Sequence, residues 1–75
     1  MQEHIVEYRV EALLQKGPPG RRLGIIKNSI TANSPYEARD KFLRELATKD
    51  WRIVSGAILH PHSPRVVLCY LPCQV

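Results

Sequence analysis

Residues 34–50, SPYEARDKFLRELATKD, are the stretch that most clearly predicts a helix. Ser34 can cap the first turn, and Pro35 suits the first helical position, where no backbone N–H is needed. Glu37 stands three residues after the cap and can return a hydrogen bond to it, which completes a capping box. The apolar residues of this stretch recur at helical spacing, at Ala38, Phe42, Leu43, Leu46 and Ala47. The pattern predicts an amphipathic helix that packs on a sheet.

The opposite side of this predicted helix is charged. Acids stand four residues before bases in three pairs, which are Glu37 with Lys41, Asp40 with Arg44 and Glu45 with Lys49. Each such pair adds about 0.3 kcal/mol to helix stability. We therefore expect this side of the helix to face water.

The chain before the helix predicts two strands. Residues 4–15 alternate between apolar and polar, which is typical of a half-buried antiparallel strand. Residues 16–22, KGPPGRR, contain two glycines and two prolines and predict a hairpin connection. The alternation resumes over residues 23–32, with Asn28 among the apolar positions. A polar residue there indicates an edge strand or a bulge.

Two further strands are predicted after the helix, over residues 51–59 and 65–71, joined by the turn HPHSP at residues 60–64. The order strand, strand, helix, strand, strand predicts an α+β fold of ββαββ type, a four-stranded antiparallel or mixed sheet with the helix packed on one face. Residues 1–75 are expected to form a single small domain, because a chain this short supports only one core.

Composition excludes some classes of protein. The chain is 44% hydrophobic and 24% charged, as ordinary globular domains are. No apolar run approaches the roughly 18 residues that a membrane span needs, and the N-terminus lacks the pattern of a signal peptide. We therefore expect a cytoplasmic protein without a membrane partner. A small core also favours a homo-oligomer, because a second copy can cover apolar surface.

The two cysteines, Cys69 and Cys73, are four residues apart. On one extended strand their Cα atoms would be about 13 Å apart, beyond the reach of a disulfide. We expect reduced thiols, with Cys69 packed and Cys73 near a loose end; a bridge between two molecules is the alternative.

Histidine and cysteine side chains near the C-terminus could in principle ligate zinc. If residues 61–63 form the turn, Cys73 lies roughly 25 Å along the strand from His60 and His62, too far for one tetrahedral site. A site shared across a dimer stays open. The same separation argues against a cysteine nucleophile with a histidine base. We therefore predict no catalytic residues, no metal and no cofactor.

Basic residues concentrate in the first connection and the strand after it. No acid occurs between residues 16 and 34, and the four cations that would face a nucleic acid are Lys16, Arg21, Arg22 and Lys27. Such a cluster can neutralise phosphates, although no aromatic residue is interleaved to stack on bases. RNA binding through this hairpin is our alternative functional hypothesis.

The last two strands are apolar on both faces, and one helix can cover only one of them. Trp51, directly after the helix, either fills the space under the helix C-terminus or anchors an interface. The residues predicted to form an interface are Trp51, Val54, Ile58, Val67, Cys69 and Leu71. Our leading hypothesis is a non-enzymatic protein-interaction module, a homodimer formed through the face or edge of these two strands.

Two family resemblances accompany this interpretation. The chain resembles a family of small uncharacterised bacterial and phage domains, in EYRV at residues 7–10, FLRELA at 42–47, DWRIVS at 50–55 and VVLCYLP at 66–72. It departs from that family at Asp50, where glycine is usual, and in its longer first hairpin. The resemblance implies the strand and helix order, and the family has no established activity to carry over. From the apolar surplus of the last two strands and Trp51, we expect a small accessory or inhibitor protein of a bacterium or phage.

The second resemblance covers about residues 8–59. The chain is similar to archaeal ribosomal protein LX at residues 8–10, 32–34 and 37–38 and in the strand that follows the helix. This resemblance implies binding of ribosomal RNA through basic loops, although the chain carries fewer basic residues than that family.

Overall fold

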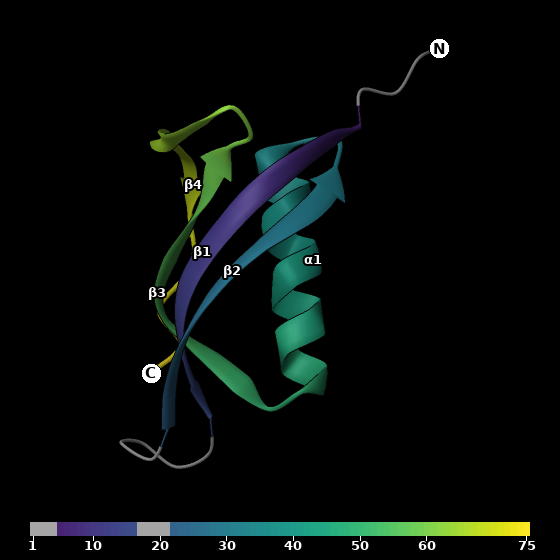
Figure 1. Ribbon diagram of the computed structural model, residues 1–75. Coiled ribbons are helices and arrows are strands. Elements are labelled where there is room, and N and C mark those ends of the chain that lie inside the picture. Colours follow the sequence, from purple (N-terminus) through teal and green to yellow (C-terminus); the bar gives the residue numbers. More distant parts are fainter. Residues whose placement is uncertain (1–4, 17–21) are drawn as a thin grey trace.

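The computed structural model describes residues 5–16 and 22–75 and contains four strands and one helix (Figure 1). In chain order the elements are β1 (Val6–Lys16), β2 (Arg22–Ala32), α1 (Pro35–Thr48), β3 (Trp51–His60) and β4 (Ser63–Tyr70). The predicted order ββαββ is confirmed, and each bound lies within two residues of the expected one. Most of the predicted hairpin connection lies outside the described residues.

The four strands form one sheet in the order β2-β1-β3-β4, and every neighbouring pair is antiparallel. Because β2 and β3 flank β1, they run parallel to each other, and α1 connects them by crossing one face of the sheet (Figure 1). The predicted α+β class is confirmed, and the sheet is antiparallel rather than mixed. β2 is an edge strand, as the polar Asn28 indicated.

The start of α1 is capped by Ser34, whose hydroxyl accepts a hydrogen bond from the backbone N–H of Glu37 at 3.1 Å. The predicted return bond from Glu37 to Ser34 is wrong. The Glu37 carboxylate instead accepts from Asn33 Nδ2 at 3.3 Å and pairs with Lys41 Nζ at 3.4 Å. Lys41 also donates to the Thr31 carbonyl at 2.8 Å, so this group ties the helix to the end of β2.

These contacts change the acidity of Glu37. Burial alone would raise the pKa of Glu37, but the hydrogen bonds from Lys41 and Asn33 outweigh it and lower the pKa below its ordinary value. The ionised carboxylate therefore stabilises the fold at neutral pH. This contribution is lost as the pH falls through the lowered pKa.

The other two predicted charge pairs differ in outcome. Glu45 pairs with Lys49 at 3.1 Å, whereas Asp40 pairs with its neighbour Arg39 at 3.3 Å instead of with Arg44. The helix ends before Asp50, which has φ 59° in the left-handed region. Glycine usually occupies such a position after a helix, and aspartate tolerates it better than most residues.

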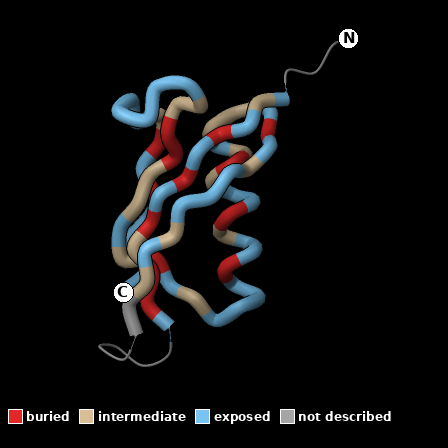
Figure 2. Tube along the Cα trace, viewed as in Figure 1, coloured by how far each residue is buried: buried red, intermediate tan, exposed pale blue. Residues whose placement is uncertain are grey.

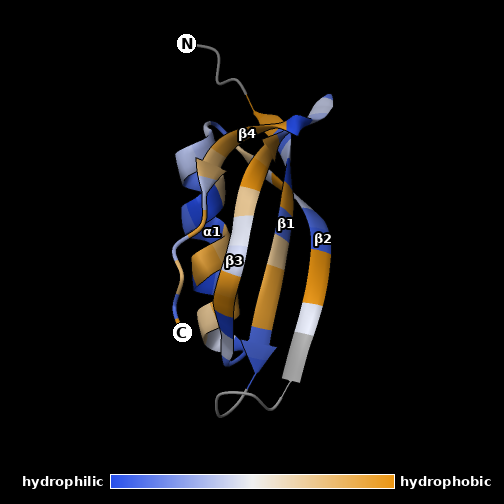
Figure 3. Ribbon diagram, turned by 90° about the vertical axis from the view of Figure 1, so that its left-hand side faces the viewer, coloured by the Kyte–Doolittle hydropathy of each residue, from blue (hydrophilic) through white to orange (hydrophobic). Residues whose placement is uncertain are grey.

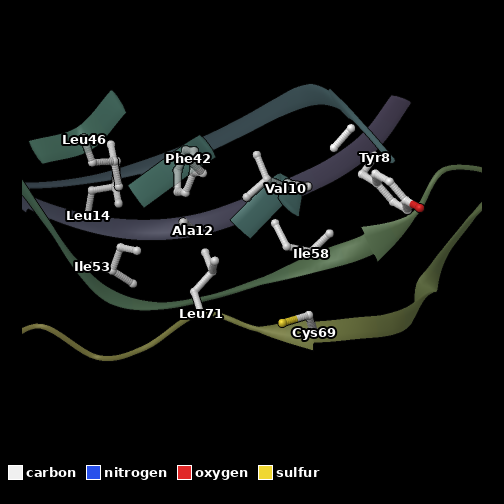
Figure 4. Packing of buried hydrophobic residues seen from close by; sticks show 12 residues of the cluster. Tyr8, Val10, Ala12, Leu14, Phe42, Leu46, Ile53, Ile58, Cys69 and Leu71 are labelled. Carbon is white, nitrogen blue, oxygen red and sulfur yellow. The ribbon is translucent and has the colours of Figure 1, made fainter. Parts of the chain in front are cut away.

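The core lies between α1 and the sheet (Figure 4). From the helix, Ala38, Phe42 and Leu46 are buried, as predicted, whereas Ala47 is exposed. The sheet contributes alternate residues of β1, two residues of β3 and two from β4 and the chain after it, namely Tyr8, Val10, Ala12, Leu14, Ile53, Ile58, Cys69 and Leu71. Figure 2 shows that burial concentrates on β1, β3 and the inner side of α1, while β2 is exposed or half-buried over most of its length.

A β-bulge in β3 decides which residues enter this core. Leu13 pairs with Ser55 and Leu14 with Ile53, so Val54 is an extra residue on β3. The bulge shifts the alternation by one, and therefore Ile53 and Ile58 both face the helix. Strict alternation along this strand would have placed these two isoleucines on opposite faces.

Gly56 occupies the tightest point of the packing. A Cβ added there would lie 2.7 Å from the Glu11 carbonyl oxygen and 2.8 Å from both Ala12 Cβ and Leu71 Cδ1. Leu71 lies over this glycine and donates its backbone N–H to the Gly56 carbonyl at 3.0 Å. Further along, the backbone N–H of Gln74 donates to the Ile53 carbonyl at 2.7 Å, and Gln74 Oε1 accepts from the Ile53 N–H at 3.0 Å. The residues after β4 thus continue along β3.

The close approach at Gly56 predicts a large difference between two glycine substitutions. Gly56→Ala should lower the free energy of unfolding by about 1–3 kcal/mol, because backbone and core atoms must move. Gly24→Ala is the matched control: its added Cβ meets only Trp51 Cη2 at 4.0 Å, and the change should stay within about 0.5 kcal/mol. Urea unfolding of the two variants measures both values, and equal losses would contradict the packing described for Gly56.

The lowered pKa of Glu37 predicts a pH-dependent effect. Glu37→Gln should lower the midpoint of thermal unfolding at about pH 7, where the wild-type carboxylate is ionised, and should have a smaller effect at a pH below the lowered pKa, where the carboxylate is protonated. Circular dichroism melts of both proteins at the two pH values measure the difference. An equal difference between the two unfolding midpoints at both pH values would show that the charge of Glu37 does not stabilise the fold.

Candidate functional site

The face of the sheet opposite α1 carries no second layer among the described residues. Figure 3 shows the four strands side by side in front of the helix, with hydrophobic segments on each. The pairing places the side chains of this face in three rows across the strands: Ile25, Leu13 and Ser55; Lys27, Glu11, Ala57 and Tyr70; and Ser29, Arg9, Leu59 and Val67. We call these eleven residues the open face.

Large apolar side chains lie at both sides of the open face. Ile25 on β2 is 77% exposed and Tyr70 on β4 is 74% exposed, the highest values among the large hydrophobic residues that the structure describes. Val67 is 38% exposed, whereas Leu59 between it and Arg9 is buried. Exposed hydrophobic residues gathered on one face are typical of an interaction surface.

The centre of the open face is polar and carries both signs of charge. Lys27 Nζ lies 3.6 Å from Glu11 Oε1, and Arg9 occupies the next row. Beside this pair is a hollow of about 310 Å³, lined on its apolar side by Leu13 and Ile25. Ser55 and the backbone of Gly56 also line the hollow.

The structure divides the predicted interface residues. Val67 belongs to the open face, and Val54 is half-buried at the bulge. Three of the predicted interface residues, Ile58, Cys69 and Leu71, are not available to a partner, because they are 0%, 9% and 7% exposed and belong to the core. The register of β3 and β4 causes this, because Ile58 pairs with Cys69 on the helix side and Leu59 with Val67 on the open face.

The sixth predicted residue, Trp51, lies on the helix side of the sheet. It is half-buried, stands near Gly24 and lies under Lys16, whose Nζ is 5.5 Å from the ring centroid. With Leu46 and Lys49 it lines a groove at the C-terminal end of α1. Its position agrees with the alternative in which it fills space under the helix end.

Sequence reasoning missed three members of the open face, Leu13, Ile25 and Tyr70. Leu13 and Ile25 are directly opposite each other in the β1–β2 pairing. Each stands next to another apolar residue in sequence, in Ala12-Leu13-Leu14 and Ile25-Ile26. The sequence did contain a signal for these two residues: each is apolar at a position where the alternation of the strand requires a polar residue.

The predicted basic cluster is not brought together on one surface by the described residues. Lys16 lies on the helix side against Trp51, and Lys27 lies on the open face beside Glu11. Arg21 lies outside the described residues, and of Arg22 only the backbone is described. The two lysines thus face opposite sides of the sheet.

Among residues 5–16 and 22–75, the histidines and cysteines form no shared cluster. In the described part of the chain, no three His, Cys, Asp or Glu side chains lie close enough to hold a metal ion. His60 accepts a hydrogen bond at Nδ1 from the His62 backbone N–H at 3.1 Å. Both cysteines are free thiols, with Cys69 buried, as predicted, and Cys73 exposed.

The guanidinium of Arg39 lies near the sulfur of Cys69 and near two other residues of α1, Tyr36 and Asp40. It lies 3.9 Å from Cys69 Sγ and 5.5 Å from the ring centroid of Tyr36. Its hydrogen bond to Asp40 raises the pKa of Arg39 above its already high ordinary value. The guanidinium is therefore a permanent charge that covers the sulfur from the solvent side of the helix.

Comparison with known proteins adds no assignment: no family model, curated protein or solved structure matches the chain. Both family resemblances stay predictions from the sequence. Over the described residues, the helix has neither the length nor the apolarity needed to cross a bilayer.

The different burial of the two thiols predicts different reactivity. Cys73 should react with a maleimide reagent within minutes, whereas Cys69 should be modified only after denaturation, because the reagent must reach the sulfur. Mass spectrometry of the labelled protein, before and after addition of guanidinium, measures both sites. Equal labelling of the two cysteines in the native protein would contradict the burial of Cys69.

Proposed function

We propose that this chain is a non-enzymatic protein-interaction module of the cytoplasm that acts as a homodimer through its open face. The observation that carries the proposal is the exposure of Ile25 and Tyr70 on the same side of the sheet, opposite the helix. Water contact with both side chains is unfavourable, and a second copy removes it. Packing of two sheets face to face is a common way to bury such surfaces.

The size of the open face supports a second copy as the partner. Four strands spaced about 4.8 Å apart and eight to eleven residues long give a flat area of roughly 500–700 Å². Specific protein pairs bury about 800 Å² of accessible surface on each side. Accessible surface exceeds flat area because side chains project from it, so contact over the whole face reaches the required size.

The shape and charge of the open face also favour pairing with itself. A two-fold interface requires that each feature meets its complement on the same surface. Tyr70 is a projecting aromatic residue, and the hollow beside Leu13 and Ile25 is a recess in the same face. We propose that Tyr70 of each copy enters the hollow of the other, where Lys27 and Glu11 lie within reach of its hydroxyl group.

The mixed charge of the open face argues for this dimer over the RNA-binding alternative. A nucleic-acid surface gains affinity from cations that are available to phosphates. Lys27 already has a carboxylate partner in Glu11, and Lys16 lies on the other side of the sheet. RNA binding would therefore have to depend on the positive charges of Arg21 and Arg22.

The dimer predicts that a charge at Tyr70 dissociates it. Tyr70→Glu should shift the protein from twice the chain mass to the chain mass at micromolar concentration, because the carboxylate cannot enter an apolar contact without loss of its hydration. Size-exclusion chromatography with light scattering measures the mass. Tyr36→Glu is the matched control, since Tyr36 is 61% exposed but lies on α1, and this variant should keep the dimer.

The same column run separates the two functional hypotheses. A wild-type monomer, or a dimer that survives both Tyr70→Glu and Ile25→Glu, would contradict the proposed interface. Absorbance at the nucleic-acid and protein wavelengths reports bound RNA. Co-eluting RNA that is lost when Arg21 and Arg22 are both replaced by alanine would favour the alternative.

A further inference from the structure

The helix side of β2 is only partly covered in its middle. On this side β1 carries four buried residues, while Ile26 and Ile30 of β2 are half-buried and Asn28 is exposed. The middle of β2 is therefore partly open on the side of the helix. Figure 2 shows this loss of burial toward the edge strand.

A groove of about 300 Å³ lies between this part of β2 and α1. Its apolar surface comes from Leu14, Ile26, Phe42, Leu46 and Trp51, and its polar margin from Asn28, Glu45 and Lys49. The helix residues stand at positions 42, 45, 46 and 49, which form one stripe along α1. The groove thus runs along the strand and the helix together and has a volume at the small end of ligand sites.

The outer edge of β2 is open to strand addition, unlike that of β4. β2 pairs with β1 over eleven residues without a register shift, has no proline, and presents no charged residue on its helix side from Gly24 to Ala32. β4 is shorter, contains Pro64 and pairs irregularly with β3. Prolines, bulges and inward charges protect sheet edges from pairing with other chains. Only β4 has the first two devices, and between Gly24 and Ala32 the helix side of β2 has none of the three.

Charge at one end of the groove indicates the direction of an added strand. At the Trp51 end lie Lys16, over the Trp51 ring, and Lys49, which pairs with Glu45 at 3.1 Å. This is the end where β2 begins, near Gly24. A peptide antiparallel to β2 has its C-terminal end there, so its carboxylates would meet Lys16 and compete with Glu45 for Lys49.

We propose that β2 and α1 form a binding site for an extended peptide that adds to the edge of β2 in antiparallel direction. Alternate apolar side chains of the peptide enter the groove, and its acidic C-terminal end lies at Lys16 and Lys49. Backbone hydrogen bonds supply affinity in such strand addition, and the groove supplies specificity. The groove opens on the opposite face of the sheet from the proposed dimer interface, and Ile25 at the edge of β2 lines both sites.

Trp51 offers a direct readout, since it is the only tryptophan of the chain and lines the groove. The probe is the synthetic peptide Thr-Val-Thr-Leu-Thr-Val-Glu-Glu with a free carboxylate. Titration should shift Trp51 emission to shorter wavelength in a saturable manner. A peptide with two lysines and an amide at its end should bind about tenfold weaker or worse, because it meets Lys16 and Lys49 with like charge.

Two variants of neighbouring exposed residues test the location. Asn28→Glu places a carboxylate at the groove and should weaken binding of the acidic peptide by about tenfold or more. Ser29→Glu makes the same charge change on the other side of the same strand and should change the affinity by less than about threefold. Both titrations are repeated in the Tyr70→Glu background, so that loss of the dimer and loss of peptide binding are measured separately.

Three outcomes would overturn the proposal. The first is the absence of any saturable change in Trp51 emission or in amide NMR shifts of β2 at millimolar peptide. The second is equal weakening by Asn28→Glu and Ser29→Glu, which would indicate attraction by net charge alone. The third is a change in the mass of the assembly in solution with Asn28→Glu, while the peptide changes neither the Trp51 emission nor the NMR shifts. That result would assign the edge of β2 to a second copy of the chain.

Discussion

One helix has to cover a sheet that is about twice its width. An α-helix with its side chains is about 10–12 Å across, whereas four strands at about 4.8 Å spacing span about 19 Å. The chain meets this constraint by packing α1 against the helix sides of β1 and β3, where burial is highest. Leu71, beyond the end of β4, fills the remaining space over Gly56. As a result, a strip along β2 stays uncovered. Because the chain has only one helix among its described residues, the other face of the sheet is also left open.

The elements of this fold could be predicted from the sequence because local patterns specify them. The Ser34 cap and the four-residue spacing of Ala38, Phe42 and Leu46 define α1 without reference to the rest of the chain. Alternation defines β1 equally well. The alternation cannot show the bulge at Val54, because the bulge arises from the pairing of β3 with β1. Because of that one extra residue, Ile58 faces the helix on the same side as Ile53. The irregular pairing of β3 with β4 places Cys69 opposite Ile58.

The candidate sites were harder to predict than the fold, for the same reason. A surface forms where residues from different strands become neighbours, as Ile25 and Leu13 do across β1 and β2. The register of the β1–β2 hairpin decides which residues become neighbours, and the composition of the chain does not reveal that register. The basic residues illustrate the opposite case. Lys16 and Lys27 are near each other in sequence. Lys16 pairs with Arg22, however, and Lys27 stands five positions further along β2, an odd step that puts the two lysines on different faces.

The two uncovered surfaces have different physical characters, which argues for different partners. The open face is broad and carries large apolar side chains beside charges of both signs, so a second copy with the same features matches it. The strip at β2 is narrow and bordered by an unpaired strand edge, so it matches a single extended segment. Since the surfaces lie on opposite sides of the sheet, a dimer joined at the open faces holds both grooves on its outer surfaces. Such a dimer would bind two peptide segments of one partner with an avidity that depends on the linker between them.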